Sequence, residues 1–425
     1  MRQQVQSVAI SEAAPDAIWA VAGDFFAPWH PAITTMAAEG TIRAFTVADE
    51  DKTYRERLTY LSHSDRTYAY THVEGIEGVH RYDARLTVSP RDGGGSVITM
   101  SADLTAPAGR AEEIAAGTKA IFDDGVRVLA SMPLPEPIPP SGSEIKPGKD
   151  VPLETLLLDD LPKLAVTVTP SKPGPLVLFL HGIGGARTNW AAQLPAAGAV
   201  TGAAAMDLRG YGDSSLGAAQ TTIDDYCADI LRVREALGAD RLILCGLSYG
   251  SWIATSFAMR HPDLLAGLIL SGGCTGMSEA GPEEREAFRL SRETPLNAGQ
   301  TPADFAPAVV DVIAGPDAGE DARAALHASM SAIPTATYRD ALTCFTNPLE
   351  KFDFAKLTMP VLMMTGEHDR LAPPAEIRAV AGRIYDQSAQ PDVQFEVISG
   401  AGHVCNLEAP GVYNAHLIPF LQRLA

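Results

Sequence analysis

A run of prolines divides this chain into two parts. Residues 132–150 read MPLPEPIPPSGSEIKPGKD, with prolines at positions 133, 135, 137, 139, 140 and 147. Because proline lacks an amide N–H and fixes φ, this spacing excludes a helix and favours an extended spacer. We therefore predict two domains, residues 1–132 and 151–425, joined by a proline-rich linker over residues 133–150. A length of 425 residues agrees with this, because single cores rarely organise so long a chain.

The net charge and the cysteine content limit which partners and which cellular compartment we expect for this protein. The formal net charge of -19 would repel phosphate backbones and anionic lipids, so we expect neither a nucleic-acid nor a membrane partner. Five widely spaced cysteines indicate neither a disulfide framework nor a metal site, and they fit free thiols in a reducing cytoplasm. No export signal or long apolar run is evident. We expect a cytoplasmic protein without cofactor or metal that acts on a small molecule.

The first part predicts a sheet closed by one long helix. Between residues 110 and 132, apolar side chains recur at helical spacing and form an amphipathic stripe. A curved antiparallel sheet that grips the helix would bury this stripe. A short helix should open at Pro15, where a missing N–H is harmless. The predicted strands are residues 5–10, a hairpin of 54–61 with 67–73, and a hairpin of 81–88 with 96–102.

These residues resemble the SRPBCC superfamily, the helix-grip fold of START-like and polyketide-cyclase-like proteins. The resemblance rests on SEAAPDAIWAVAGDFFAPWHPAI, on the hairpins ERLTYLSHSDRTYAYTHVEG and YDARLTVSPRDGGGSVITMSADL, and on the closing helix. It implies a cavity that holds an apolar ligand, a lipid or an aromatic molecule, or that carries out cyclisation. His30 could be an acid or base at the cavity mouth, but we expect a packed loop histidine because no partner acid can be placed.

After the linker, apolar strands alternate with helical segments. This order is typical of a mostly parallel, doubly wound α/β sheet. The strand candidates are continuous apolar runs, as expected when helices cover both faces of the sheet. They are residues 176–180, 202–208, 242–245, 265–270, 361–365 and 393–398.

A candidate nucleophile lies in the turn after the third of these strands. The string Gly246-Leu-Ser248-Tyr-Gly250 stands between the strand and a helix-like stretch. In a strand-turn-helix context, Gly-x-Ser-x-Gly forms a nucleophile elbow, in which the glycines permit a cramped backbone and expose the serine hydroxyl. The helix that follows directs its N–H groups toward developing negative charge.

A serine nucleophile needs a base and an acid that orients the base. Asp369 follows a strand in Thr-Gly-Glu-His-Asp, and His403 follows the last strand in Ser-Gly-Ala-Gly-His. Taken alone, Asp369 could cap a loop and His403 could be a packed histidine, but their order and strand-end positions predict a Ser-His-Asp triad with Ser248. Glu367 is a weaker competitor for the acid, and we take His368 as a bystander.

The oxyanion formed by attack on a carbonyl needs two backbone donors. Tyr249 follows the nucleophile and should supply one N–H. The second should come from the loop His181-Gly-Ile-Gly-Gly185, where Ile183 is our choice because glycines on both sides let its amide turn inward.

Residues 151–425 look like the α/β-hydrolase superfamily. The resemblance rests on the oxyanion string, Asp207-Leu-Arg-Gly-Tyr-Gly-Asp-Ser, the elbow, GEHD and GAGH, which fall in family order. It implies that the Asp207 loop is structural, with Arg209 and the aspartates pairing. A serine at position 248 departs from the dehalogenase and epoxide-hydrolase branches and puts those activities in doubt.

About 90 residues separate the strands at 265–270 and 361–365, far more than an ordinary connection. In the family this is the place of a helical cap, which we expect over residues 275–348. Helices are predicted at 282–290, from Thr301-Pro302, and at 321–333. Cap side chains could line an apolar pocket or simply pack a core, and they are Phe305, Met330, Tyr338 and Phe345. Arg187, beside the oxyanion loop, could meet a substrate carboxylate, but we expect it to be solvated.

The leading hypothesis is a serine hydrolase of small esters or lactones that works through an acyl-enzyme, with an accessory apolar-ligand-binding domain. The segment GAGHVCNLEAP looks most like the enol-lactonase and carboxylesterase branch. One alternative is a carbon-carbon bond hydrolase of a β-diketone-like compound. Another is a ligand-binding or sensor protein that carries a passenger hydrolase fold.

Overall fold

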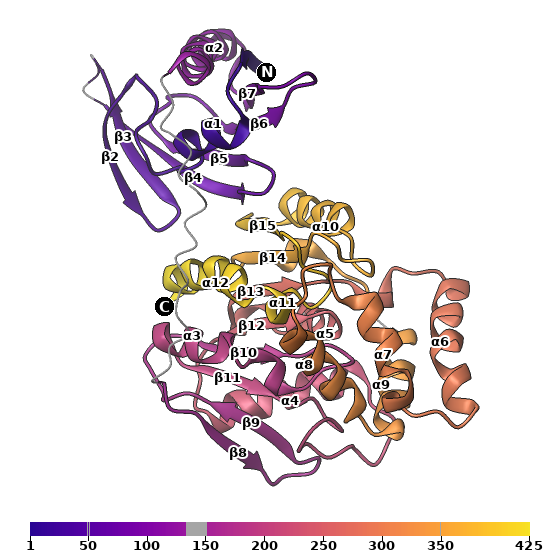
Figure 1. The fold of residues 1–425 in the computed structure, drawn as a ribbon. Helices are drawn as coiled ribbons and strands as arrows, with labels where there is room; N and C mark the ends of the chain where they lie inside the picture. The colour runs from indigo at the N-terminus through magenta and orange to yellow at the C-terminus, as the bar shows by residue number, and fades with distance from the viewer. Residues whose placement is uncertain (49, 51, 133–150, 349) are drawn as a thin grey trace. The chain divides into compact units, whose positions relative to one another are not determined.

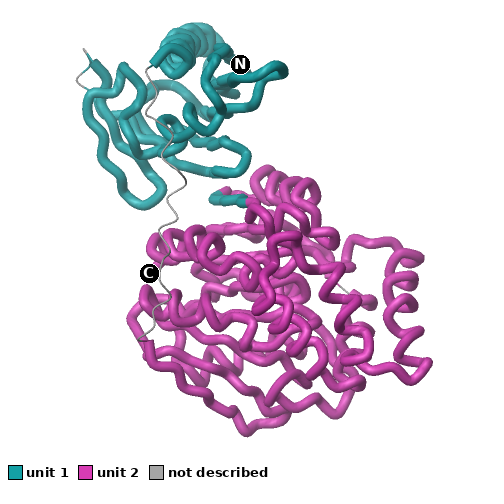
Figure 2. Tube along the Cα trace, viewed as in Figure 1, with its two compact units in different colours: residues 1–141, 392–396 teal, residues 142–391, 397–425 magenta. Residues whose placement is uncertain are grey.

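The computed structural model describes residues 1–48, 50, 52–132, 151–348 and 350–425. The chain forms two compact units, Met1–Ser141 with Asp392–Glu396 and Gly142–Pro391 with Val397–Ala425 (Figure 2). The predicted linker over residues 133–150 lies outside the described residues.

The first unit is an antiparallel sheet in the order β1-β7-β6-β5-β4-β3-β2, with the long helix α2 packed on β1 and β7 (Figure 1). Buried and less buried residues alternate along β6 and β7, as they must when one sheet face meets the helix. The predicted hairpins and closing helix are present. The elements are β1 (Arg2–Ser11), α1 (Pro15–Ala22), β2 (Ile33–Glu39), β3 (Ile42–Val47), β4 (Thr53–Ser62), β5 (Thr67–Glu74), β6 (Arg81–Pro90), β7 (Ser96–Thr105) and α2 (Ala108–Ser131).

The interior of this unit is not purely apolar. Arg43 and Glu56 form a buried ion pair, with Nε 2.8 Å from Oε2, and the Arg43 guanidinium lies 4.0 Å from the Phe25 ring centre. His30 is buried, with Nε2 3.0 Å from the Ile121 carbonyl oxygen, and burial lowers its pKa. These contacts account for His30 as a packed histidine.

The second unit is built on a sheet in the order β14-β13-β12-β10-β11-β9-β8. Strands β10 to β14 pair in parallel, and β9 is antiparallel to β11 and to β8. Nearly every residue of the parallel strands is buried, as predicted from their continuous apolar runs. The strands are β8 (Glu154–Leu158), β9 (Leu164–Val168), β10 (Leu176–Leu180), β11 (Ala203–Met206), β12 (Leu242–Leu247), β13 (Leu265–Ser271) and β14 (Val361–Gly366). Strand β15 (Val393–Ile398) is divided between the units, and its residues from 397 onward belong to this one.

Helices flank this sheet and separate its strands along the chain. Helix α3 packs on β11, α5 on β12 and β13, and α10 on β14. No helix in the described ranges has both the length and the apolar character required to cross a bilayer. The flanking helices are α3 (Gln193–Val200), α4 (Ile223–Ala236), α5 (Tyr249–Arg260), α10 (Pro374–Gln387), α11 (Cys405–Glu408) and α12 (Pro410–Leu424).

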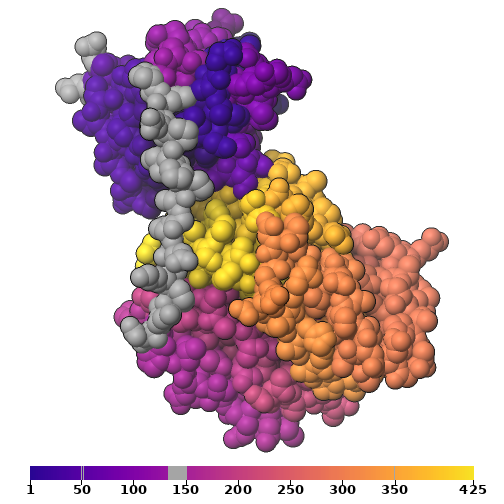
Figure 3. All heavy atoms as spheres, in the orientation of Figure 1, coloured from indigo at the N-terminus to yellow at the C-terminus, as the bar shows by residue number. Residues whose placement is uncertain are grey.

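Four helices between β13 and β14 form what we call the cap. Figure 3 shows them as a continuous part of the surface of the second unit. Helix α7 begins as predicted, where the Thr301 N–H and hydroxyl both donate to Asp304 Oδ2. Helix α6 is longer than predicted and α9 was not foreseen. The cap helices are α6 (Pro282–Asn297), α7 (Pro302–Ile313), α8 (Glu320–Ser331) and α9 (Thr335–Thr346).

Candidate active site

Ser248 occupies a strained turn between β12 and α5. Its φ of 53° and ψ of -112° make it one of two described non-glycine residues with positive φ. The Ser248 N–H donates to the Ser271 carbonyl at 2.7 Å, and its own carbonyl accepts from the N–H groups of Ser251 and Trp252. Such a conformation costs about 1–3 kcal/mol and persists only where the surroundings impose it.

The two glycines of the elbow are required by close backbone contacts. A Cβ on Gly246 would lie 2.3 Å from the Gly250 carbonyl oxygen, and one on Gly250 would lie 2.2 Å from the Leu180 carbonyl oxygen. The Ser248 side chain makes no capping hydrogen bond to α5. The turn therefore presents a hydroxyl that does not cap the start of α5.

Asp369 and His403 are joined by a hydrogen bond. His403 Nδ1 lies 2.8 Å from Asp369 Oδ2, and both residues are buried. The other carboxylate oxygen accepts the N–H groups of Leu371 at 2.8 Å and Ala372 at 2.9 Å, which fix the carboxylate plane. Because a carboxylate accepts, Nδ1 carries the imidazole proton and Nε2 is left able to accept another.

Ser248 and His403 meet the same glycine turn after β13. A Cβ on Gly272 would lie 3.2 Å from His403 Cε1 and Nδ1, and a Cβ on Gly273 would lie 3.3 Å from the Ser248 carbonyl oxygen. Gly272 therefore packs against the His403 imidazole, and the next residue, Gly273, packs against the backbone of Ser248. Ser248 follows β12 and Asp369 follows β14, at the carboxyl edge of one parallel sheet, and the hydrogen bond to Asp369 holds His403 at the same edge.

The competing acid is engaged elsewhere. Glu367 Oε2 accepts the Ser399 hydroxyl at 2.7 Å and the Gly400 N–H at 3.0 Å. These bonds, the backbone one first, lower the pKa of Glu367. The neighbouring His368 side chain is 47% exposed. Within the described residues, Asp369, and not Glu367, is therefore the carboxylate that is hydrogen-bonded to His403 Nδ1.

The loop after β10 is fixed around the predicted oxyanion donor. The Gly182 carbonyl accepts from the Gly185 N–H at 2.9 Å and lies 2.8 Å from His181 Nδ1. In a planar trans peptide the N–H points opposite to the carbonyl. Because the Gly182 carbonyl is held by two donors, the Ile183 N–H is directed to the other side of the loop.

Two buried side chains complete this support. His181 Nε2 accepts the Leu208 N–H at 3.1 Å, so the ring proton resides on Nδ1; burial lowers the pKa of His181 and keeps it neutral. The Tyr211 hydroxyl donates to the Ile183 carbonyl at 3.0 Å. Tyr249 is the first residue of α5, so its N–H has no partner within the helix. Sequence reasoning did not assign roles to His181 and Tyr211.

Cap helix α8 lies against the oxyanion loop. A Cβ on Gly184 would lie 3.1 Å from Met330 Sδ, and the Ser329 hydroxyl donates to the Gly184 carbonyl at 3.1 Å. Of the four cap residues predicted to contact substrate, Met330 is the one placed on the backbone of this loop.

The other three predicted cap residues lie in aromatic contacts. The Phe345 ring centre is 5.3 Å from those of Tyr249 and Trp252, so Phe345 packs on the helix that follows the nucleophile. Phe305 and Tyr338 pair with each other, with ring centres 5.7 Å apart. Phe345 therefore adjoins a predicted oxyanion residue, while Phe305 and Tyr338 pack between α7 and α9.

Arg187 is not solvated, which corrects the expectation. Its guanidinium pairs with Asp207 and lies 2.7 Å from Asp213, and the side chain is 14% exposed. Arg209 pairs instead with Asp229, at 2.8 Å. Both arginines thus serve to fix the loop after β11, and the partners of Arg187 were not visible from its sequence neighbours.

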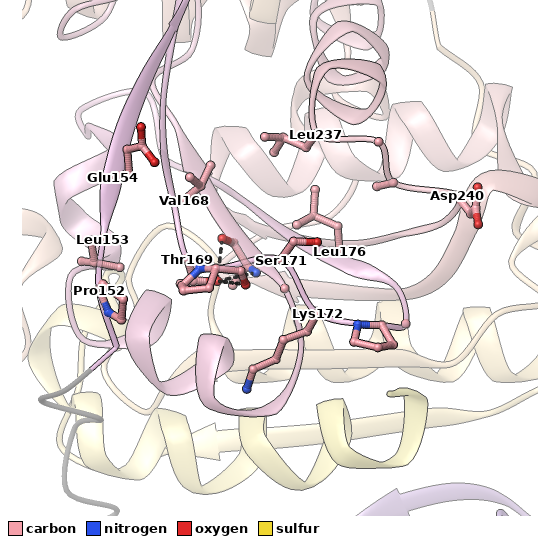
Figure 4. Close-up of a pocket in the computed structure, with 17 residues that line it drawn as sticks. Pro152, Leu153, Glu154, Val168, Thr169, Ser171, Lys172, Leu176, Leu237 and Asp240 are labelled. Carbon is pink, nitrogen blue, oxygen red and sulfur yellow. Dashed lines mark hydrogen bonds between the residues drawn. The ribbon is translucent and has the colours of Figure 1, made fainter.

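A separate pocket of about 630 Å³ lies at the opposite end of the sheet (Figure 4). Leu176 and Ala203, at the amino ends of β10 and β11, line it, together with Leu237 after α4. Ser248 follows the carboxyl end of β12, so this pocket is distinct from the candidate active site. In the described part of the chain, no group of three or more His, Cys, Asp or Glu residues is arranged to hold a metal ion.

Comparisons with known proteins agree with this two-part fold. Residues 2–131 match the family described as polyketide cyclase / dehydrase and lipid transport, and residues 177–416 match the alpha/beta hydrolase family. A thermophilic esterase from Thermogutta terrifontis is 26% identical, with a TM-score of 0.55 over 64% of this chain and 99% of its own. A carboxylesterase from Bacillus subtilis, 21% identical with a TM-score of 0.53, covers 64% of this chain and 92% of its own and shows the same fold.

A curated relative, epoxide hydrolase B of Mycobacterium tuberculosis, is 38% identical over 103 residues. That match covers 24% of this chain and 29% of the relative's length. The family match is broader, since residues 177–416 make up more than half of the chain and contain the serine, the aspartate and the histidine. The chain carries an N-terminal helix-grip domain of the polyketide-cyclase-like type, and it belongs to the alpha/beta hydrolase family.

Proposed function

We propose that this protein is a serine hydrolase that cleaves a small ester or lactone through an acyl-enzyme. The observation that carries the proposal is the buried His403–Asp369 hydrogen bond of 2.8 Å, formed at the sheet edge where Ser248 occupies its strained turn. A strained nucleophile, a base and an orienting acid are the three parts that acyl transfer to serine requires.

The proposed reaction has two halves. His403 Nε2 takes the proton of Ser248 Oγ while the oxygen bonds to the carbonyl carbon, and the carbonyl oxygen becomes an oxyanion. The N–H groups of Ile183 and Tyr249 stabilise that charge, each by on the order of 3 kcal/mol. The intermediate expels the alkoxide, which His403 protonates. Water then attacks the acyl-enzyme with His403 as base, and release of the acid regenerates Ser248.

The acyl group should lie under the cap. Met330 and Phe345 place a thioether and an aromatic ring beside the oxyanion loop and the start of α5, so an apolar acyl chain suits this side better than a charged one. The likeness to the thermophilic esterase, at 26% identity over almost its whole length, supports an ester substrate.

The test is hydrolysis of an aryl ester and of a lactone by wild-type protein and by Ser248→Ala. Ser291→Ala is the control, because Ser291 lies on an exposed part of α6 and its hydroxyl bonds only within that helix and its neighbour Arg292. We expect Ser248→Ala to lose at least about a thousandfold in kcat and Ser291→Ala to keep wild-type rates. Wild-type turnover by Ser248→Ala would overturn the proposal.

For residues 2–131 we propose an accessory role in holding an apolar ligand. The support is the match to a family described by cyclase, dehydrase and lipid-transport activities. Equilibrium dialysis of the full chain with a radiolabelled fatty acid, and with a small aromatic compound, tests this role. Saturable binding that Ser248→Ala retains would support it, and no retention of either compound would contradict it.

We also propose a reducing, cytoplasmic location, which the five buried free thiols favour.

A further inference from the structure

A second carboxylate holds the loop that carries His403. Glu408, at the end of α11, accepts the Gly402 N–H at 2.8 Å and the Val404 N–H at 3.1 Å. These are the residues immediately before and after His403. One side chain therefore fixes the backbone on both sides of the proposed base.

The same carboxylate reaches the cap. Glu408 Oε2 also accepts the N–H of Gly315 at 2.6 Å, from the connection between α7 and α8. Beside it, the His403 N–H donates to the Ile313 carbonyl at 2.7 Å. The cap connection is thus bonded to the His403 loop at two points, one through Glu408 and one directly.

The two segments approach too closely for side chains to intervene. A Cβ on Gly402 would lie 2.3 Å from the Ile313 carbonyl oxygen, and a Cβ on Gly315 would lie 2.5 Å from the Gly400 carbonyl oxygen. Glycine is the residue that permits backbone contact of this kind. The cap connection and the histidine loop therefore form one backbone layer, with Glu408 bound to both sides.

We propose that Glu408 is a positioning residue that couples the cap to His403. By binding the connection at residues 313–315 and the loop at residues 402–404, it sets the placement of α7 and α8 and the orientation of the imidazole together. This inference rests on the proposed function, because it assigns Glu408 to the base of that reaction. Glu408 itself touches neither substrate nor the reacting atoms.

The negative charge of the Glu408 carboxylate strengthens its hydrogen bonds, so a neutral side chain would hold the same N–H groups less firmly. Hydrogen bonds from N–H groups to a carboxylate are stronger than those to a neutral amide. Glutamine keeps the size and one acceptor oxygen, so Glu408→Gln can satisfy part of the set and should fold. Aspartate is one methylene shorter, so Glu408→Asp keeps the charge but draws it away from the three N–H groups.

Glu367 provides a matched control. It is also a glutamate bound to the histidine loop, but its partners are Ser399 and Gly400, at the beginning of the loop. In the described structure it bonds neither to the residues that flank His403 nor to the cap. Glu367→Gln therefore removes the same charge from the same loop without releasing the coupling.

The first experiment compares steady-state kinetics of wild type, Glu408→Gln, Glu408→Asp and Glu367→Gln on an aryl ester. We expect kcat to fall about tenfold for both Glu408 variants, with KM changed less than about threefold, because a displaced base slows chemistry more than binding. Glu367→Gln should stay within about twofold of wild type. Equal losses for the Glu367 and Glu408 variants, or unchanged kcat in Glu408→Gln, would overturn the inference.

The second experiment is hydrogen exchange by mass spectrometry on full-length Glu408→Gln and wild type. We expect amide exchange to become faster both in the peptides that cover residues 313–315 and in those that cover residues 402–404. Exchange in the rest of the second unit should stay unchanged. Faster exchange in residues 402–404 alone would overturn the coupling to the cap.

The two proposals fail differently. Wild-type turnover by Ser248→Ala would remove the proposed function. An inactive Ser248→Ala together with wild-type kcat in Glu408→Gln would leave that function in place and reject the role of Glu408.

Discussion

His403 Nδ1 lies 2.8 Å from Asp369 Oδ2, although 34 residues separate them along the chain. Replacing Asp369 by Asn would keep the size of the side chain but let its amide stabilise the wrong imidazole tautomer. We expect Asp369→Asn to lower kcat by about 10⁴-fold with little change in KM. Steady-state kinetics on an aryl ester check this. If Glu367→Gln lowered kcat by the same factor, Glu367 would instead be the acid that orients His403.

The Tyr211 hydroxyl supports the oxyanion loop from outside the site, through its hydrogen bond to the Ile183 carbonyl. Tyr211→Phe removes that bond and leaves the part-buried Ile183 carbonyl without this donor, which costs at most about 1–3 kcal/mol. We expect kcat to fall about tenfold while KM stays close to wild type. A variant with a lowered unfolding temperature but unchanged kcat would show that the loop keeps its shape without Tyr211.

Met330 should limit the size of the acyl group, because its sulfur lies against Gly184 of the oxyanion loop. Met330→Ala shortens this side chain and opens space beside the loop. We expect the ratio of kcat/KM for an octanoyl ester to that for an acetyl ester to rise about tenfold. Leu290→Ala, at a 46% exposed position on α6, is the control and should leave the ratio unchanged. An unchanged ratio in Met330→Ala would place the acyl group elsewhere.

Because the cysteine thiols are buried, we expect the free energy of unfolding to fall as the pH rises in the alkaline range. Burial raises the pKa of Cys245 and of Cys274 from 9.0 to about 12. Between these values the unfolded chain releases thiol protons that the folded chain retains, so the free energy of unfolding falls as pH rises. The contribution is fully present below pH 9.0 and is lost by about pH 12.

Two measurements check this prediction. The urea midpoint should decline from pH 9 to pH 11, and a thiol reagent at pH 8 should modify none of the five cysteines until the protein unfolds. Rapid modification of the native protein would show that the thiols are accessible.

Much of the site could be predicted because its parts are local strings. The elbow, Asp369 and His403 each follow an apolar strand directly, and parallel strands bring their carboxyl ends to one edge. Glu408 was missed because its partners are backbone N–H groups, which sequence does not single out. Arg187 was misread because Asp207 and Asp213 lie 20 and 26 residues away.

Among the missed elements, β2, β8 and α9 have weak apolar patterns for identifiable reasons. Most residues of β2 and β8 are exposed, so these strands lack the alternation that marks a half-buried strand. Helix α9 buries Thr337 and Asp340 among its core-facing residues, which breaks the apolar period expected of a helix. Thr337 bonds to the Gly210 carbonyl and Asp340 to the Thr221 N–H, and these tertiary partners were not apparent from the segment itself.

Covalent labelling is the most direct test of Ser248 as a nucleophile activated by His403 and Asp369. The full-length protein is treated with a fluorophosphonate, digested, and mapped by mass spectrometry, with Ser248→Ala and Asp369→Asn treated in parallel. We predict one adduct per chain on Ser248, none in Ser248→Ala, and much slower labelling in Asp369→Asn. An adduct on another serine, or no adduct on the folded wild type, would contradict it.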